Sequence, residues 1–278
     1  MAEADLVKTQ EPVREPDGSI VVSVRGIKIC FGDQVVHEGL DLDVRKGEIL
    51  GVVGGSGTGK SVLMRSIIGL QTPAEGEIRV FGTSMIGRDE NEARNIRRRW
   101  GVLFQAAALF STLTVTENVQ LPIREYFPGL DQQLMDEIAS YKIAMTGLAD
   151  DAGAKYPAEL SGGMKKRAGV ARALALDPDL LFLDEPTADL DPIGAAAFDE
   201  LILDLRNALQ LTVFLITHDL DTLYAICDRV AVLADKKVIA VGTIDELLAL
   251  DHPRIQEYFH GPRGRAVTEH SGTVKARQ

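Results

Sequence analysis

A glycine-rich segment around position 57 carries the residues best suited to bind phosphate. Residues 54–61 read Gly54, Gly55, Ser56, Gly57, Thr58, Gly59, Lys60 and Ser61, which fits the pattern G-x-x-x-x-G-K-[ST]. Glycines let the backbone approach a phosphate closely, so that several N–H groups can donate to its oxygens. Lys60 would reach the β- and γ-phosphates of a nucleotide, and the Ser61 hydroxyl would hold Mg²⁺. The alternative is a glycine-rich turn with an incidental lysine.

Two acids supply the second half of such a site. Asp184 and Glu185 directly follow the apolar run Leu180-Leu181-Phe182-Leu183, which predicts a buried strand. Asp184 would coordinate Mg²⁺, directly or through water, and Glu185 would act as general base on the attacking water. An ordinary strand end with solvated acids is the alternative, and the phosphate loop argues against it.

The elements that must position these residues alternate between strand and helix. Apolar and β-branched runs predict strands at 20–31, 35–44, 49–53, 76–81, 100–104, 180–183, 212–217, 230–233 and 238–241. Helices are expected at 60–69, 90–99, 193–209 and 244–250, with an inserted helical subdomain at about 115–176. This pattern predicts an α/β fold with a P-loop NTPase core. We expect a mostly parallel sheet with helices on both faces and a small antiparallel β lobe.

The composition of the chain limits the classes of ligand that it can be expected to bind. The 278 residues carry a formal charge of −11 and only 5% aromatics, which disfavours nucleic acid as a ligand. Cys30 and Cys227 are expected to be small buried residues without a metal or disulfide role. The first nineteen residues lack the apolar core of a signal peptide and predict a flexible tail. The sequence contains no run of about 18 apolar residues, so we expect no membrane-spanning helix.

Further motifs, in order along the chain, resemble those of ABC-transporter ATPases. Leu160-Ser161-Gly162-Gly163-Met164 resembles the family signature, and the resemblance covers about residues 21–250. It implies an ABC ATPase domain over 20–250, using ATP and Mg²⁺. It also implies roles for further residues: Phe31 would stack on adenine, Gln105 would sense Mg²⁺ and face a membrane subunit, His218 would contact the γ-phosphate, and residues 188–191, ending in Asp191, would touch the opposite protomer at the ATP site.

The resemblance also implies a composite site. In the family, the signature of one protomer completes the ATP site of the other, so Ser161, Gly162 and Gly163 are expected to act in trans. The chain carries one phosphate loop and one signature, which predicts a homodimer with two sites. The expected location is the cytoplasmic face of the inner membrane, where integral membrane permease subunits would hold the dimer.

Finer features resemble one branch of the family. Residues 54–63, the run Met164-Lys165-Lys166-Arg167 and Asp191-Pro192-Ile193 are similar to the Mla-type ATPases, also called toluene-tolerance or Mce-associated ATPases. This resemblance implies phospholipid as the substrate and an Mce-domain lipid-binding protein as a further partner. Two alternatives stay open. One is an ABC motor for another substrate, such as an amino acid or metal importer, and the other is a soluble ABC ATPase in cofactor assembly or repair.

The residues after 250 resemble the C-terminal extension of that branch, which we place at 251–278 with a disordered end. Ile255, Tyr258 and Phe259 share one face of a predicted short helix that is too small to fold alone. It could pack on its own domain, but we expect it to dock on the partner protomer.

Four histidines lie outside the matched motifs and are expected at the surface, namely His37, His252, His260 and His270. Two basic runs are open to two interpretations. Residues 165–167 are either a solvated helix face or a feature of the branch. Residues 97–99 are first an exposed face and only second a patch for anionic headgroups.

Overall fold

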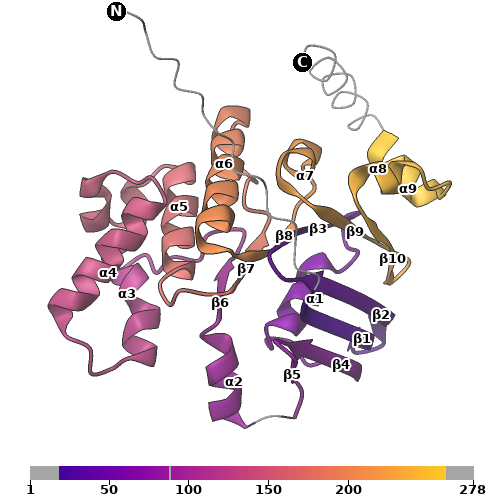
Figure 1. The fold of residues 1–278 in the computed structure, drawn as a ribbon, viewed down its shortest axis with the longest axis horizontal. Helices are drawn as coiled ribbons and strands as arrows, with labels where there is room; N and C mark the ends of the chain where they lie inside the picture. The colour runs from indigo at the N-terminus through magenta and orange to yellow at the C-terminus, as the bar shows by residue number, and fades with distance from the viewer. Residues whose placement is uncertain (1–18, 88, 261–278) are drawn as a thin grey trace, which may run out of the picture.

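Two β-sheets organise the residues that the computed structural model describes, which are 19–87 and 89–260. The smaller sheet is antiparallel, with the order β2-β1-β4-β5, and lies at the lower right of Figure 1. Its strands are β1 (Ile20–Phe31), β2 (Gln34–Arg45), β4 (Glu75–Val80) and β5 (Thr83–Ser84). This sheet is the antiparallel lobe that the sequence predicts, with the short strand β5 as an addition.

The larger sheet carries the strands that end at the predicted site. Its order is β10-β9-β3-β8-β7-β6, and its neighbouring strands are parallel except for β10, which runs antiparallel to β9. Because parallel strands end at the same edge, the residues that follow β3, β7 and β8 are brought together. The strands are β3 (Ile49–Gly54), β6 (Trp100–Leu103), β7 (Leu180–Asp184), β8 (Thr212–Ile216), β9 (Arg229–Ala234) and β10 (Lys237–Gly242).

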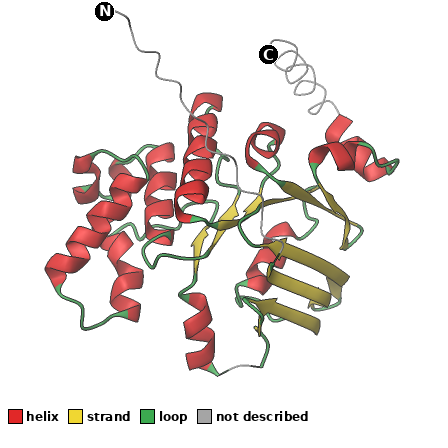
Figure 2. Ribbon diagram, in the orientation of Figure 1, coloured by secondary structure: helices red, strands yellow, loops and turns green. Residues whose placement is uncertain are grey.

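Helices cover the larger sheet and form a block beside it, as Figure 2 shows in red. Helices outside the block are α1 (Lys60–Ile67), α2 (Glu90–Arg97), α6 (Pro192–Leu209), α7 (Leu220–Ile226), α8 (Ile244–Leu248) and α9 (Pro253–His260). The block contains α3 (Val115–Tyr126), α4 (Gln132–Met145), α5 (Gly162–Ala173) and two 3₁₀ turns, η1 (Asp150–Ala154) and η2 (Pro157–Glu159). The predicted fold class is confirmed, and α7 is the one of these α-helices that the sequence analysis missed. Among the described helices, none combines the length and the apolar character needed to cross a bilayer.

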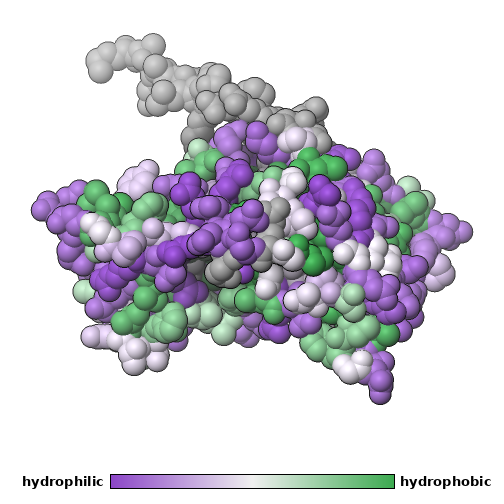
Figure 3. Space-filling view, turned by 90° about the horizontal axis from the view of Figure 1, so that it is seen from below, coloured by the Kyte–Doolittle hydropathy of each residue, from purple (hydrophilic) through white to green (hydrophobic). Residues whose placement is uncertain are grey.

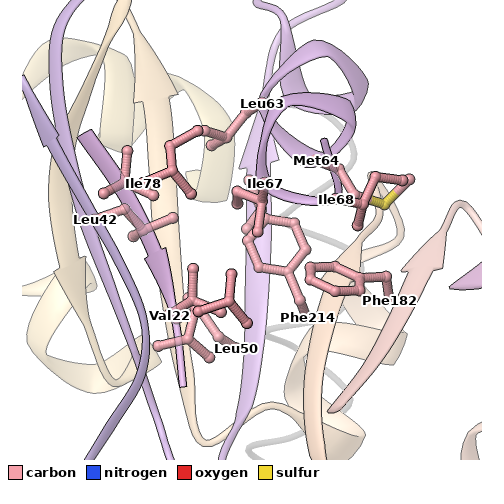
Figure 4. Close-up of a cluster of buried hydrophobic side chains, with 14 of the residues drawn as sticks. Val22, Leu42, Leu50, Leu63, Met64, Ile67, Ile68, Ile78, Phe182 and Phe214 are labelled. Carbon is pink, nitrogen blue, oxygen red and sulfur yellow. The ribbon is translucent and has the colours of Figure 1, made fainter. Parts of the chain in front are cut away.

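Alternate residues of the buried strands feed two separate cores. Phe182 of β7 and Phe214 of β8 face the cluster between the sheet and α1, with ring centroids 5.5 Å apart (Figure 4). Leu181 and Leu183 point to the opposite face, where they pack with α5 and α6. Both faces of β7 are therefore covered, which explains why its sequence is a continuous apolar run rather than an alternating one.

The helix that starts at the signature lies very close to the edge strand β6. A Cβ atom added at Gly101 of β6 would be 2.2 Å from the carbonyl oxygen of Ala173, and one at Gly169 of α5 would be 2.5 Å from Leu103 Cδ1. Only glycine fits at these two positions without a shift of its neighbours. The signature helix is thus pressed onto the sheet that carries the acids.

The C-terminal helix α9 corrects one prediction. Ile255 and Phe259 are 1% and 2% exposed, and they join a cluster of their own domain that includes Val53 and Val230. The apolar face is therefore already covered within the chain, because burying it there removes it from water without a partner. Our expectation that this face docks on the partner protomer is wrong. Residues 261–278, with Gly261-Pro262 and His270, lie outside the described residues, as do residues 1–18.

A bulge in β2 overturns a second expectation. Ile27 pairs with Leu40, whereas Ile29 pairs with His37, so β2 has one residue more than β1 over this stretch. Gly39, in the bulge, has φ +62°. The extra residue switches the face of the strand, and His37 becomes fully buried instead of lying at the surface. His252 is partly exposed, and the side chain of His260 is outside the described set.

The two cysteines and the basic run 97–99 lie in the following surroundings. Cys30 and Cys227 are free thiols and partly buried, which is less than the full burial we expected. Arg97 is partly exposed, and Arg98 and Arg99 are exposed. Arg99 is nevertheless anchored, because its Nε lies 2.7 Å from Asp179 Oδ2 and its guanidinium lies over the Phe81 ring.

Candidate active site

The phosphate loop joins β3 to α1. Gly59, which precedes Lys60, has φ +90°, and a Cβ atom there would lie 2.5 Å from Val36 Cγ1 and 2.6 Å from His37 Nε2. Glycine is required at this position for both reasons. The imidazole of His37 lies beneath the loop, with Nε2 3.0 Å from the Gly59 carbonyl oxygen. Because a carbonyl oxygen can only accept, Nε2–H of His37 is the donor in this contact. Burial lowers the pKa of His37.

Lys60 and Ser61 occupy the first turn of α1. The Lys60 ammonium donates to the carbonyl oxygens of Gly54 and Gly55, at 2.8 and 3.1 Å. Burial lowers the pKa of Lys60, and the nearby Glu185 and Asp184 oppose this effect. The Ser61 hydroxyl donates to Asp184 Oδ1 at 3.0 Å. A cation, a hydroxyl and a carboxylate therefore meet at the mouth of the loop.

Asp184 and Glu185 differ in environment although they are neighbours. Asp184 is 6% exposed, and burial raises its pKa, while the Ser61 hydrogen bond and nearby cations lower it. Glu185 follows β7 with φ +48°, an unusual conformation for a non-glycine residue. Its backbone N–H donates to the Ile216 carbonyl at 2.8 Å, and its Oε2 lies 2.7 Å from Nδ1 of His218. The carboxylate is thereby oriented at the open edge of the sheet, where it can accept a proton from water.

These contacts fit a magnesium–nucleotide complex. Oxygen ligands and an incomplete protein shell suit Mg²⁺, which usually takes one or two protein ligands together with phosphates and waters. Ser61 and Asp184 form such an oxygen pair. Among the described residues, no group of three or more His, Cys, Asp or Glu side chains is arranged to hold a metal ion. The loop and the dipole of α1 suit the phosphates of the nucleotide.

The signature lies on a different part of the surface from the phosphate loop. Ser161 caps α5 by accepting from the Met164 N–H at 3.3 Å, and Ser161 and Gly162 are exposed. In Figure 1, α5 stands in the helical block, away from α1. The hydrogen bonds found among the described residues do not join Ser161–Gly163 to the loop of the same chain. This separation agrees with an action in trans.

The remaining predicted residues have mixed surroundings. Phe31 ends β1 with 49% of its surface exposed, which leaves its ring open to stacking. Gln105 is exposed in the loop after β6. Asp191 accepts from the Gly194 N–H at 2.7 Å, so one of its oxygens caps α6. A cavity of about 350 Å³ lies between residues 187–190 and 218–221, beside His218.

Two residues of the site were missed or misread from the sequence. His37 supports the phosphate loop from below. Lys166 is 5% exposed, and its Nζ donates to the backbone carbonyls of Gln105 and Glu185. Arg167 donates to the carbonyls of Thr146 and Ala197. Of the two interpretations left open for residues 165–167, the solvated face does not hold for Lys166 and Arg167, because both turn their charges inward. The helical spacing of Lys166 with the apolar Val170 was the available signal.

The geometry agrees with comparisons to known proteins. A family model described as "ABC transporter" matches residues 37–188, which is more than half of the chain. The chain belongs to the ABC transporter family. This ABC ATPase is an ATP-hydrolysing transporter subunit, and the phosphate loop, the acidic strand end and the signature all lie within the matched residues.

Relatives of the ABC ATPase carry different transport names. It is 37% identical to a probable ribonucleotide transport ATP-binding protein, mkl, of Mycobacterium leprae, over 90% of this chain and 71% of mkl. It is 39% identical to the intermembrane phospholipid transport system ATP-binding protein MlaF of Haemophilus influenzae, over 87% of this chain and 90% of MlaF. It is 42% identical to the methionine import ATP-binding protein MetN of Rhizobium johnstonii, over 82% of this chain and 62% of MetN.

A solved structure supports the same fold for the ABC ATPase. It is the dimeric, post-hydrolysis state of the ATP-binding cassette MJ0796, bound to ADP and Pi. The TM-score is 0.73 and the identity 29%, over 80% of this chain and 98% of that cassette. The relative is thus a dimer with nucleotide products bound.

Proposed function

We propose that this ABC ATPase hydrolyses ATP at two composite sites of a homodimer and thereby powers phospholipid transport between bacterial membranes. The observation that carries the chemistry is the meeting of Ser61, Asp184, Glu185 and His218 at one edge of the sheet. Lys60 and the backbone of residues 54–59 would bind the phosphates, and Phe31 would stack on the adenine. Glu185 would take the proton of the attacking water. His218 would orient the Glu185 carboxylate and contact the γ-phosphate.

Ser61 and Asp184 would hold Mg²⁺, with Gln105 close to it from the loop after β6. The bound ion would neutralise charge on the phosphates. The residues of this chain do the rest: Lys60 binds, the loop N–H groups orient, and Glu185 accepts the proton. In the dimer, Ser161, Gly162, Gly163 and the segment ending at Asp191 would close the site of the opposite protomer. The exposed position of Ser161 supports this arrangement.

The phospholipid assignment rests on the match to MlaF. That match covers 90% of MlaF. The resemblance of the run 164–167, of Asp191-Pro192-Ile193 and of the residues of α9 to the Mla-type branch points in the same direction. A motor of this kind works on permease subunits and, through them, on an Mce-domain protein at the inner membrane. Figure 3 shows the face seen from below, where small hydrophobic groups are separated by hydrophilic residues. Such a mixed surface suits docking to a protein better than insertion into lipid.

Reconstitution tests the substrate. The chain would be purified with its membrane partners, placed in proteoliposomes and assayed for ATP-dependent transfer of a fluorescent phospholipid. We expect transfer with the native chain and none with Glu185→Gln in the same complex. Stimulation of ATP hydrolysis by methionine or by ribonucleotides, without lipid transfer, would instead support the functions named for MetN or mkl. A rate of ATP hydrolysis that does not change when the membrane partners are added would favour a non-transport ABC ATPase.

A further inference from the structure

A buried lysine connects the signature helix to both loops that carry catalytic side chains. Lys166 lies on α5, five positions after Ser161, and it is 5% exposed. Its ammonium donates to the carbonyl of Gln105, in the loop after β6, and to the carbonyl of Glu185 at 3.3 Å. One cation on the signature helix thus reaches the backbone of the proposed magnesium sensor and that of the proposed base.

Both loops have a backbone that needs support. Glu185 has φ +48°, and Ala107 and Ala108, just after Gln105, have φ +59° and +50°. Such conformations are unfavourable for residues other than glycine and persist only where the surroundings hold them. Arg172, also on α5, donates to the carbonyls of Ala108 and Ala107 at 2.6 and 2.9 Å. The helix therefore holds the Gln105 loop with two cations, and Lys166 is the one that also reaches Glu185.

The charge of Lys166 faces the catalytic acids. Burial lowers its pKa, and the carboxylates of Asp189, Glu185 and Asp184 oppose that effect. Lys165, the preceding residue, shows what a lysine without this role looks like, because it is partly exposed and no side-chain hydrogen bond of its ammonium is found in the described structure. Lys165 is therefore a matched control with the same charge on the same helix.

We propose that Lys166 is a positioning residue that passes the position of the signature helix to Gln105 and Glu185 of its own chain. When ATP held by the phosphate loop of the opposite protomer contacts Ser161, the position of α5 changes. Lys166 transmits that change to Glu185 of its own chain, which is the base of the other ATP site. The two ATP sites are then coupled through one side chain per protomer. This inference rests on the composite site and on Glu185 as the base.

Steady-state kinetics tests the positioning role. Lys166→Met should lower kcat roughly 10- to 100-fold, the equivalent of a lost charged hydrogen bond, with the Kd for ATP changed less than about threefold. The Hill coefficient for ATP should fall toward one. Lys166→Arg, which keeps a charged donor, should recover part of kcat, and Lys165→Met should behave as the native chain. If Lys166→Met does not fold, Lys166→Gln takes its place. Native kcat in a folded Lys166 variant, or parallel losses of kcat, ATP affinity and Tm, would overturn the proposal.

Mixed dimers separate an action in the same chain from an action across the dimer. Each dimer has a single working base, because one protomer carries Glu185→Gln. Adding Lys166→Met to the protomer with the native Glu185 should lower turnover, whereas adding it to the Glu185→Gln protomer should have little effect. The opposite pattern would show that Lys166 acts only through Ser161 in trans, and it would overturn the assignment. If Glu185→Gln alone leaves turnover unchanged, the failure lies in the assigned base and not in Lys166.

Discussion

Nδ1 of His218 lies 2.7 Å from Oε2 of Glu185, although the two residues are 33 positions apart in the sequence. The contact exists because β7 and β8 are parallel neighbours, paired up to Asp184 and Ile216, so that their next residues leave the sheet side by side. His218 is largely exposed, whereas Glu185 is mostly covered. The open imidazole can therefore meet a ligand while it orients the carboxylate behind it.

Glu185→Gln should separate binding from hydrolysis. The amide keeps the size and a hydrogen bond to His218 but cannot accept the proton, so turnover should fall roughly 10²- to 10⁴-fold. ATP should still bind, and the variant should accumulate as an ATP-bound dimer in size-exclusion chromatography. Glu38→Gln, an exposed change on β2, is the control. Near-native turnover would exclude Glu185 as the base.

A composite site predicts complementation between two inactive chains. Lys60→Ala removes the charge that faces the phosphates and should weaken ATP binding. Ser161→Arg should block the signature of its own chain but leave its phosphate loop intact. Mixed dimers of the two then contain one complete site and should regain up to about half of the native activity per dimer. Cross-linking would verify that mixed dimers form, and inactivity of these verified dimers would contradict the shared site.

Asp199 predicts a pH-dependent contribution to stability. It is 5% exposed on α6, accepts from Thr222 Oγ1 at 2.8 Å, and its Oδ1 has no hydrogen-bond partner. Burial, helped by the Asp219 and Asp221 charges against the effect of the Thr222 bond, raises its pKa from 3.8 to about 6. The folded state therefore holds this proton more tightly than the unfolded chain. Its contribution to stability falls as the pH rises from about 4 to 6, and the loss persists above that.

Asp199→Asn mimics the protonated acid and should remove this loss. The unfolding free energy of the variant minus that of the native chain should increase by roughly 1–3 kcal/mol from pH 4 to pH 8. Urea denaturation at the two pH values measures this difference. Asp204→Asn, on the more open part of α6, should show no comparable change between the two pH values. An equal effect of Asp199→Asn at both pH values would show that the Asp199 carboxyl does not titrate in this range.

Phe259→Ala tests where the C-terminal helix docks. The ring is 2% exposed in a core cluster of its own chain, so its loss should cost about 3–5 kcal/mol of unfolding free energy. Leu250→Ala, at a 43% exposed residue nearby, should cost little. Sedimentation without nucleotide should show the same oligomeric state for both variants and the native chain. Unchanged stability together with weaker dimerisation would restore the docking on a partner that the structure contradicts.

The strands and the catalytic motifs were predictable because their signals are local. Leu180–Leu183 is apolar throughout because both faces of β7 are covered, and the acids at its end mark the edge of the sheet. The phosphate loop needs glycines at fixed positions, so its spacing alone predicts its geometry. β1, for example, begins and ends where the residue pattern places it.

The residues that were misread depend on contacts far along the chain. Lys166 is polar in type but finds the Gln105 carbonyl 61 positions away, and no local pattern contains that contact. Ile255 and Phe259 form an apolar face whose partner is settled only by the packing of β3, β9 and α7. In both cases the type of side chain shows only that burial is possible. The tertiary structure determines which residues the side chain packs against.

The extra residue in the bulge at Gly39 allows β2 to contribute both to the core of the lobe and to the support of the phosphate loop. The residues after it turn Leu40, Leu42 and Val44 into the core of the lobe, while the residue before it turns His37 toward the phosphate loop. Deleting a single residue here would restore a regular ladder and reverse the side chains on one arm of the strand. The chain should therefore tolerate many substitutions at Glu38 better than the deletion of one residue. At this point of β2, the number of residues matters more than their identity.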